Sequence, residues 1–233
     1  MTLVSIVIPV LNEAAALPSL LDRLAELDGR FEVVVADGGS ADGTVALAAA
    51  HPSKPHVVRA PRGRARQLNA GAGAASGAAL LFLHADTILP ADAYRSLTGA
   101  LSDDAVLGGN FQLRFDGADR FSRMLGAWCA IQRRAGIYYG DSVIWLRATA
   151  FERLGGFREL AVMEDYELVR RLERAGGTTC LPGPAVTSAR RWQRLGLPRT
   201  IASWVLIRWL FIAGASPARL ARLYPHVREE AHV

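Results

Sequence analysis

The sequence predicts an α/β fold with a mostly parallel sheet in its first half and a mixed second half. Over residues 3–83, short β-branched apolar runs alternate with segments of helical periodicity. After residue 101 this alternation gives way to a loosely alternating strand, helices and one further strand. The chain has 233 residues, 51% of them hydrophobic, which is enough to bury a sizeable core. We therefore expect a single domain with a parallel half (1–101), a mixed half (102–195) and C-terminal helices (196–233).

The parallel half is predicted from its hydrophobic spacing. Leu3–Val10 is nearly continuous in apolar residues, which is typical of a strand covered on both faces. Leucines at helical spacing predict a helix over Ala14–Leu27. The elements that follow are predicted as strand, helix, strand, helix and strand at Glu32–Ala36, Asp42–Ala50, His56–Arg59, Arg64–Ala75 and Ala79–Leu83. Ligands of such sheets bind at the carboxyl ends of the strands.

The mixed half begins with Val106–Phe115, which alternates loosely and resembles an antiparallel strand. A helix, a strand and an amphipathic helix are predicted at Ala118–Arg134, Val143–Leu146 and Tyr166–Ala175. The apolar stretch Ile201–Ala213 falls short of the roughly 20 residues that span a bilayer. It is either a buried or dimer-forming helix or an interfacial helix anchored by Trp204, Arg208 and Trp209. Residues 201–223 are thus a candidate for peripheral membrane contact or for a homodimer.

The charge of the chain is basic, since 27 Lys and Arg against 22 Asp and Glu leave +5. Nucleic acid, an anionic membrane or a phosphorylated small molecule would suit this charge. We expect no nucleic-acid partner, because the sequence contains no recognised nucleic-acid module. Cys129 and Cys180 form no CxxC pair and are interpreted as small apolar residues. The N-terminus lacks the features of a secretory signal, so we expect a cytoplasmic protein, with the inner membrane face as its one alternative location.

Asp37-Gly38-Gly39-Ser40 directly follows the second predicted strand. Glycines let the backbone approach a ligand closely, and a strand-end aspartate can accept hydrogen bonds from a base or a ribose. The alternative is an ordinary turn in which Ser40 or Asp42 caps the next helix.

Three arginines at alternate positions, Arg62, Arg64 and Arg66, lie at the start of the third predicted helix. Guanidinium groups pair with phosphate oxygens, so the run suits a pyrophosphate, although a solvated basic face is equally open. His84-Ala85-Asp86 follows the fourth predicted strand. A carboxylate there can hold Mg²⁺ or Mn²⁺ against a diphosphate, or it can simply cap a turn.

Two further charged clusters lie in the second half of the chain. Glu164-Asp165 precedes an amphipathic helix, where one carboxylate could serve as a general base or both could be held by the helix dipole. Arg190, Arg191 and Trp192 could close over a departing diphosphate or form a basic surface beside a packed indole.

Taken in order, these motifs resemble the family 2 glycosyltransferases, whose GT-A fold is a Rossmann-like, mostly parallel sheet with a mixed acceptor-side half. The resemblance rests on Ile6–Glu13, Asp37–Ser40 with Asp42–Thr44, Gly63–Gly71, Leu83–Asp86, Gly155–Phe157 and Glu164-Asp165, and it covers residues 3–195. Gly140-Asp141 and Ser188–Trp192 are similar to a small stand-alone bacterial subgroup.

The resemblance implies a role for each matching position. Pro9, Asn12 and Glu13 would border the nucleotide, and Asp37 with Gly38 would bind the base, usually uracil. Arg62 and Arg66 would lie near the base and diphosphate, beside His84 and Ala85. Asp86 would hold a Mn²⁺ or Mg²⁺ ion, and His84 stands where the family's DxD motif has its first Asp. Asp165 would be the catalytic base with Glu164 supporting it, and Asp141, Arg190, Arg191 and Trp192 would lie near the acceptor and leaving group.

The expected activity is an inverting, metal-assisted transfer of a sugar from a nucleoside diphosphate, UDP by resemblance, to a hydroxyl of a discrete acceptor. The sequence lacks the long transmembrane helices of the family's processive synthases, which favours a single transfer over polymer export. The alternative is a nucleotide-sugar-binding protein without catalysis.

Overall fold

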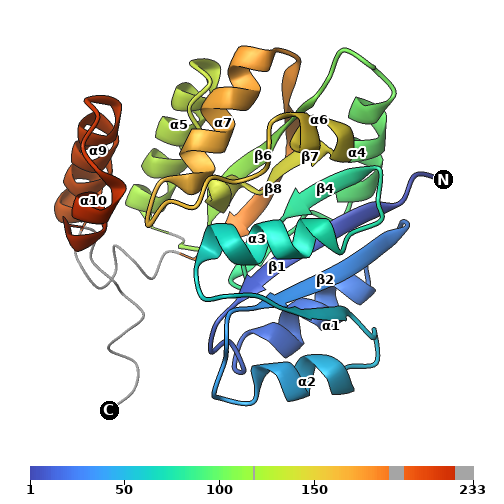
Figure 1. Ribbon diagram of the computed structural model, residues 1–233. Coiled ribbons are helices and arrows are strands. Elements are labelled where there is room, and N and C mark those ends of the chain that lie inside the picture. Colours follow the sequence, from blue (N-terminus) through green and yellow to red (C-terminus); the bar gives the residue numbers. More distant parts are fainter. Residues whose placement is uncertain (118, 189–196, 224–233) are drawn as a thin grey trace.

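The computed structural model describes residues 1–117, 119–188 and 197–223. A mixed sheet of eight strands runs through these residues in the order β3-β2-β1-β4-β7-β6-β8-β5. Helices lie on both faces of this sheet, and the last two helices stand at the end of the molecule beside α5 (Figure 1).

The parallel part of the sheet consists of β1 (Val4–Val10), β2 (Phe31–Asp37), β3 (His56–Arg59) and β4 (Ala79–Phe82). β1 lies between β2 and β4 and is parallel to both, and β3 extends the sheet beyond β2. The connecting helices are α1 (Leu17–Ala25), α2 (Thr44–Ala50) and α3 (Arg64–Gly73). The predicted alternation of strands and helices is therefore confirmed.

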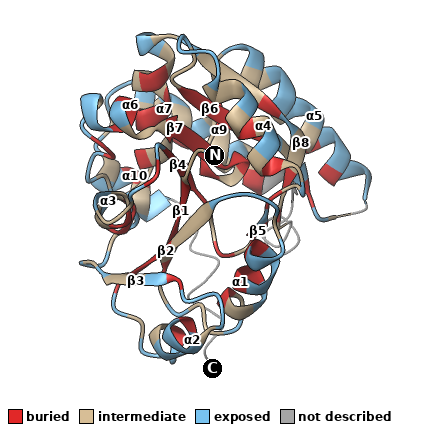
Figure 2. Ribbon diagram, turned by 90° about the vertical axis from the view of Figure 1, so that its right-hand side faces the viewer, coloured by how far each residue is buried: buried red, intermediate tan, exposed pale blue. Residues whose placement is uncertain are grey.

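Alternate residues of β1 feed two hydrophobic cores on opposite faces of the sheet. Ile6 and Ile8 pack in one core with leucines of α1 and with α4 (Ala93–Leu101). Val7 packs in the other core, under α3, α6 (Ala148–Arg153) and α7 (Glu164–Ala175). Figure 2 shows α1 and α3 on opposite sides of the strands, which are lined by buried residues. Burial on both faces explains the continuous apolar run of this strand.

The mixed part of the sheet is formed by β5 (Thr87–Ile88), β6 (Gly108–Phe115), β7 (Ile144–Arg147) and β8 (Thr178–Thr187). β7 is antiparallel to both β4 and β6, and β5 is antiparallel to β8. β6 was expected to be antiparallel, and it is so toward β7 but parallel toward β8.

β8 and α4 were not expected from the sequence. Pro182-Gly183-Pro184 interrupts β8 and has the composition of a turn. The strand continues through it because the register shifts: Phe111 pairs with Leu181, and Gln112 pairs with Pro184. Two residues of β8 are thus accommodated as an irregularity, which a strand can absorb without losing its partner.

The C-terminal helices α9 (Leu197–Ile212) and α10 (Pro217–Leu223) stand beside α5 (Arg120–Arg134) (Figure 1). Ile201 and Trp204 of α9 pack against a small core that includes Phe115. Arg208 donates a hydrogen bond of 2.5 Å to the Gln132 side chain of α5. Of the three expected interfacial anchors, only Trp209 is mainly exposed, at 61%. Over the described ranges, no helix is both long enough and apolar enough to cross a membrane.

Candidate active site

The loops that follow β1 and β2 are tied together by side chains at the carboxyl edge of the sheet. Asn12 has a left-handed backbone with φ of 54°, and its side chain accepts a hydrogen bond from the Ala41 amide at 2.9 Å. Its own amide donates to Ser40 Oγ, also at 2.9 Å. Asp42 accepts from the amides of Ala14 and Thr44, so this carboxylate joins the two loops as well. Asn12 therefore shapes the edge of the predicted nucleotide site.

Asp37 is buried at the end of β2, where its carboxylate accepts hydrogen bonds from the Gly39 and Ser40 amides. The motif therefore forms a turn, but the expected cap is wrong, because the N-cap residue of α2 is Gly43 and not Ser40 or Asp42. A Cβ added to Gly38 would lie 2.8 Å from the Gln67 side chain, so only glycine fits there without movement. Buried Gln67 of α3 donates to the carbonyls of Val10 and Ala36, which fixes α3 over the ends of β1 and β2.

Of the three alternating arginines, Arg64 is the one that reaches the second half of the chain. Its Nε lies 3.2 Å from Glu164 Oε1, and its Nη2 lies 3.9 Å from Asp165 Oδ2. Arg66 pairs instead with Glu159 at 2.8 Å, and both of those side chains are largely exposed. Arg62 is exposed and lies two residues before α3. All three arginines are thus exposed, and Arg64 differs from the other two in its ion pair with the buried carboxylate of Glu164.

Asp165 is held at the first turn of α7 by contacts to both of its oxygens. Oδ2 accepts a hydrogen bond of 2.8 Å from the Gly140 amide, and Oδ1 accepts one of 2.7 Å from the Tyr166 amide. Gly140 allows this approach, because a Cβ there would lie 2.6 Å from Arg64 Nη2 and 3.2 Å from Asp165 Oδ2. These donors fix the direction of the carboxylate. A general base must be positioned in this way toward the proton that it takes.

The backbone around this carboxylate adopts an uncommon conformation. Met163, directly before the acidic pair, has φ of 68°, and Val143, after the Gly140–Ser142 turn (η1), has φ of 56°. A left-handed β-branched residue is uncommon and costs free energy, and such residues gather at functional sites. Both positions flank the contact between Gly140 and Asp165.

Glu164 is almost completely buried beside Asp165. Burial raises the pKa of this carboxyl, the Arg64 guanidinium opposes that rise, and the neighbouring Asp165 charge adds to it. The acidic pair is therefore asymmetric, with a buried partner of raised pKa beside a carboxylate held by amide donors.

His84 lies at the end of β4 between Arg64 and Asp141. Arg64 Nη2 is in hydrogen-bond contact with His84 Nε2, and His84 Nδ1 lies 3.4 Å from Asp141 Oδ1. Because a guanidinium can only donate, this contact suits a neutral ring in which Nε2 accepts and Nδ1 carries the proton toward Asp141. In this arrangement the imidazole lone pair is directed at Arg64. The oxygens of Asp86 and Asp141 are then the local groups suited to a hard cation.

In the described ranges 1–117, 119–188 and 197–223, no cluster of three or more His, Cys, Asp or Glu side chains is arranged to hold a metal ion. Ala85 is buried, Asp86 is half-buried, and Pro9 and Glu13 are half-buried at the end of β1 and in the loop after it. The positions predicted to border a nucleotide therefore lie at one edge of the sheet, as the topology requires. Arg190, Arg191 and Trp192 lie outside the described residues.

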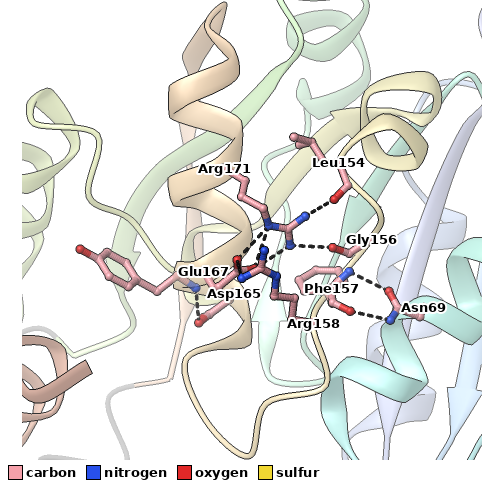
Figure 3. A network of polar contacts seen from close by, with 9 residues as sticks. Asn69, Leu154, Gly156, Phe157, Arg158, Asp165, Glu167 and Arg171 are labelled. Carbon is pink, nitrogen blue, oxygen red and sulfur yellow. Dashed lines mark hydrogen bonds and ion pairs between the residues drawn. The ribbon is translucent and has the colours of Figure 1, made fainter. Parts of the chain in front are cut away.

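A network of polar contacts links α7 to the loop at 154–157 and links that loop to α3 (Figure 3). Asn69 of α3 accepts from the Phe157 amide at 2.9 Å and donates to the Phe157 carbonyl at 2.8 Å. Arg171 of α7 donates to both oxygens of Glu167 and to the carbonyls of Leu154 and Gly156. Exposed Arg158 lies 3.1 Å from the same Glu167 carboxylate.

A cavity of about 740 Å³ opens beside Asp165, between β6, α5 and α9. Arg64, Asp141, Glu164 and Asp165 line one part of it, and most of the other lining side chains are apolar. Cys129 and Cys180 both line this cavity as free thiols, and burial raises the pKa of Cys129 to about 12. They act here as small apolar groups, as their spacing in the sequence predicts.

Several residues that organise the site were not identified from the sequence as part of it. Gln67, Asn69 and Arg171 act through backbone carbonyls and amides that come from other parts of the chain. No local pattern marks such contacts. Arg64 carried a signal, the alternating arginines, but the sequence alone could not show which member of the run faces Asp165.

Comparison with curated proteins finds relatives over part of the chain. An undecaprenyl-phosphate 4-deoxy-4-formamido-L-arabinose transferase from Sodalis glossinidius is 35% identical over 158 residues, which covers 62% of this chain and 48% of that protein. The chain thus spans about half the length of the first curated relatives it matches.

Comparison with solved structures identifies the fold as GT-A. A mannosyltransferase from Pyrobaculum calidifontis, in complex with GDP-Man and Mn²⁺, has a TM-score of 0.65 at 22% identity and covers 94% of this chain and 68% of its own. Glucosyl-3-phosphoglycerate synthase from Mycobacterium tuberculosis, in complex with Mn²⁺, UDP and phosphoglyceric acid, has a TM-score of 0.62 at 22% identity and covers 91% of this chain and 79% of its own. The family model for glycosyl transferase family 2 matches residues 5–158. With more than half of its length matched by that model, the chain belongs to glycosyl transferase family 2.

Proposed function

We propose that this chain is an inverting glycosyltransferase that moves a sugar from a nucleoside diphosphate to a hydroxyl group, with Asp165 as the general base. The observation that carries the proposal is the fixed carboxylate of Asp165, whose Oδ2 accepts from the Gly140 amide while facing a cavity. In the proposed step, Asp165 takes the proton of the acceptor hydroxyl as that oxygen attacks the anomeric carbon. The bond to the diphosphate breaks on the opposite side, so a single displacement inverts the configuration.

The nucleotide site is proposed at the edge formed by the ends of β1, β2 and β4. Pro9, Asn12 and Glu13 would border the nucleotide, and Asp37 with Gly38 would lie at the base. Arg62 and Arg66 remain proposed contacts to the base and diphosphate, and Arg64 becomes the guanidinium placed to offset charge near the acidic pair. We propose UDP as the carrier. Related folds bind both UDP and GDP-Man, so the base is a matter for direct titration.

A divalent cation, Mn²⁺ or Mg²⁺, is proposed at Asp86. The carboxylate chemistry fits: Mg²⁺ is usually held by one or two carboxylates together with substrate phosphates, so a complete cage of protein ligands is not needed. When bound, the cation would offset the negative charge that develops on the leaving diphosphate. His84 and Ala85 would lie beside it, and Asp141, Arg190, Arg191 and Trp192 stay proposed for the acceptor and leaving group.

The test uses the purified full chain with UDP-Glc, UDP-GlcNAc and GDP-Man in the presence of Mn²⁺. Asp165→Asn should lower the transfer rate by about 10² to 10⁴, because it removes the base, while the donor dissociation constant stays the same. Asp86→Ala should abolish the metal-dependent part of donor binding. Glu26→Gln, an exposed change at the end of α1, should alter neither quantity. Full transfer activity in Asp165→Asn would disprove the role of Asp165 as the general base. Binding of GDP-Man but of neither uridine donor would refute UDP as the carrier.

The second candidate is a nucleotide-sugar-binding protein without catalysis. It is favoured by one observation, the contact of His84 Nε2 with Arg64 at the position where the family has a carboxylate. The two candidates differ in one readout. The binding protein would show donor titration without release of the nucleoside diphosphate at any acceptor concentration, whereas the enzyme would release it.

A cytoplasmic location and a role for residues 201–223 in membrane contact or dimer formation stay predictions. Exposed Leu206, Trp209 and Ile212 of α9 support such a role. Sedimentation with anionic vesicles and sedimentation velocity without lipid would separate the two forms of contact.

A further inference from the structure

The cavity beside Asp165 lies on the acceptor side of the proposed centre. Its lining includes Arg64, Glu164 and Asp165 but none of the strand-end residues Pro9, Asn12 and Asp37 that are proposed to border the nucleotide. A ligand in this cavity would therefore reach Asp165 from a side that the nucleotide does not occupy. With about 740 Å³, the cavity falls in the size range of small-molecule sites.

The walls away from Asp165 are mainly hydrocarbon. Phe111, Leu113 and Phe115 of β6 form one wall, and Trp204, Val205 and Ile207 of α9 face the same space. Such a surface gains more free energy by covering apolar groups than by covering the hydroxyls of a sugar or the oxygens of a phosphate.

Two of the three arginines in these walls, Arg133 and Arg208, are bonded to other side chains, and the third, Arg134, is exposed. Arg133 donates to Asn110 Oδ1 at 2.5 Å, lies 3.4 Å from Glu173 and stacks over the Tyr138 ring. Arg208 is bonded to Gln132, which also ties α9 to α5 across the cavity. The polar end is dominated by the carboxyls of Asp141, Glu164 and Asp165, with Arg64 beside the last two. A neutral hydroxyl suits this end better than an anion does.

The apolar surface also continues out of the cavity. Trp128 of α5 lines the cavity and is 45% exposed, and Met124 and Ile131, about one turn before and after it on the same helix, are also exposed. The part of a long apolar group that extends beyond the cavity could therefore pack against this face of α5.

We propose that this cavity binds the apolar part of the acceptor, so that the acceptor is an amphipathic alcohol whose hydroxyl reaches Asp165 while its hydrocarbon lies between β6, α5 and α9. This inference rests on the proposed function and names the acceptor class for it.

The first measurement is binding alone, by calorimetric titration of n-alkyl β-D-glucosides from butyl to octyl, below their micelle concentrations. Each added methylene should tighten the dissociation constant about fourfold, which is the free energy of burying one CH₂ group, until the cavity is full. A dissociation constant that does not change with chain length would overturn the proposal. A tenfold preference for octyl phosphate over octyl glucoside would overturn the neutral-alcohol class.

Two variants locate the binding. Val205→Trp fills the cavity from α9 and should weaken octyl glucoside at least tenfold, whereas Ala202→Trp, at an exposed position outside the lining of the same helix, should change it less than twofold. Leu113→Trp fills the cavity from β6 and repeats the test if Val205→Trp does not fold. Equal affinities in the wild type and both cavity-filling variants would place the ligand elsewhere and refute the proposal.

The second measurement is transfer to the same glucosides, for which kcat/KM should rise with chain length in parallel with affinity. Because binding is measured without a donor, failure of the apolar acceptor site can be distinguished from failure of the proposed transferase function. Chain-length-dependent binding without transfer from any nucleotide sugar would remove the proposed function and with it the acceptor role. Transfer with no chain-length dependence would leave the proposed function standing and remove the apolar acceptor.

Discussion

Replacing Arg171 with methionine should destabilise the protein strongly, because this one side chain joins α7 to the loop at 154–157. Its guanidinium donates to Glu167 Oε1 at 3.0 Å, to Glu167 Oε2 at 2.6 Å and 2.9 Å, and to the Gly156 carbonyl at 2.7 Å, and it also bonds the Leu154 carbonyl. The side chains of Arg171 and Glu167 are only 15% and 11% exposed. Methionine keeps most of the aliphatic length and removes every one of these donors.

The size of the effect follows from burial. Removing one member of a buried ion pair costs about 3–5 kcal/mol, because the remaining charge has lost its partner. Arg158 stays 3.1 Å from Glu167, but it is 65% exposed and only partly compensates. We therefore expect the free energy of unfolding to fall by about 3 kcal/mol, at the lower end of this range. For a chain of this length that corresponds to a fall in Tm of about 6–12 °C.

The assay is calorimetric melting of the wild type, Arg171→Met and a control, Arg174→Met. Arg174 is exposed in the last turn of the same helix, where its charge contributes at most about 1 kcal/mol through the helix dipole. Arg171→Lys should fall between the wild type and Arg171→Met, since an ammonium cannot reach all three acceptors at once. If Arg171→Met lowers Tm no more than Arg174→Met does, the network does not hold α7 in the way we infer.

Three further predictions concern the same region and its support. Asn69→Asp keeps the acceptor for the Phe157 amide but turns an oxygen toward the Phe157 carbonyl. Denaturant unfolding should show that the free energy of unfolding falls by about 1–3 kcal/mol. An unchanged unfolding midpoint would contradict the pair of hydrogen bonds between Asn69 and Phe157. Gly71→Ala should lower the free energy of unfolding by about 1–3 kcal/mol, because its Cβ would lie 2.4 Å from Val7 Cγ1. Gly73→Ala, where a Cβ meets open space, should leave that free energy unchanged or raise it by up to about 1 kcal/mol. Equal effects of the two substitutions would refute close packing of α3 on β1. Burial raises the pKa of Glu164 in the folded state, so the stability it contributes is present below its unfolded pKa and is lost as the pH rises through the folded value. The stability advantage of the wild type over Glu164→Gln should therefore shrink as the pH rises above 4.5, and a growing advantage would contradict a raised pKa.

Local patterns predicted the elements whose periodicity is set by burial. β1 is buried on both faces, and its continuous apolar run predicted it correctly. β8 was missed because Pro182 and Gly183 have the composition of a turn, and only the pairing of Phe111 with Leu181 and of Gln112 with Pro184 carries the strand through them. Strand pairing depends on a partner far away in the sequence, which no local window contains.

The sequence by itself determined the α/β class, the parallel half and the family to which the chain belongs, since these depend on short-range spacing and on the order of motifs. Only the tertiary structure decided which charged groups meet. It selected Arg64 from three alternating arginines, placed the Gly140 amide on Asp165 and closed an apolar cavity with α9. The physical reason is that a pKa, an ion pair or a cavity depends on distances of a few ångströms between residues far apart in the chain. Those distances are fixed by packing and are absent from any local pattern.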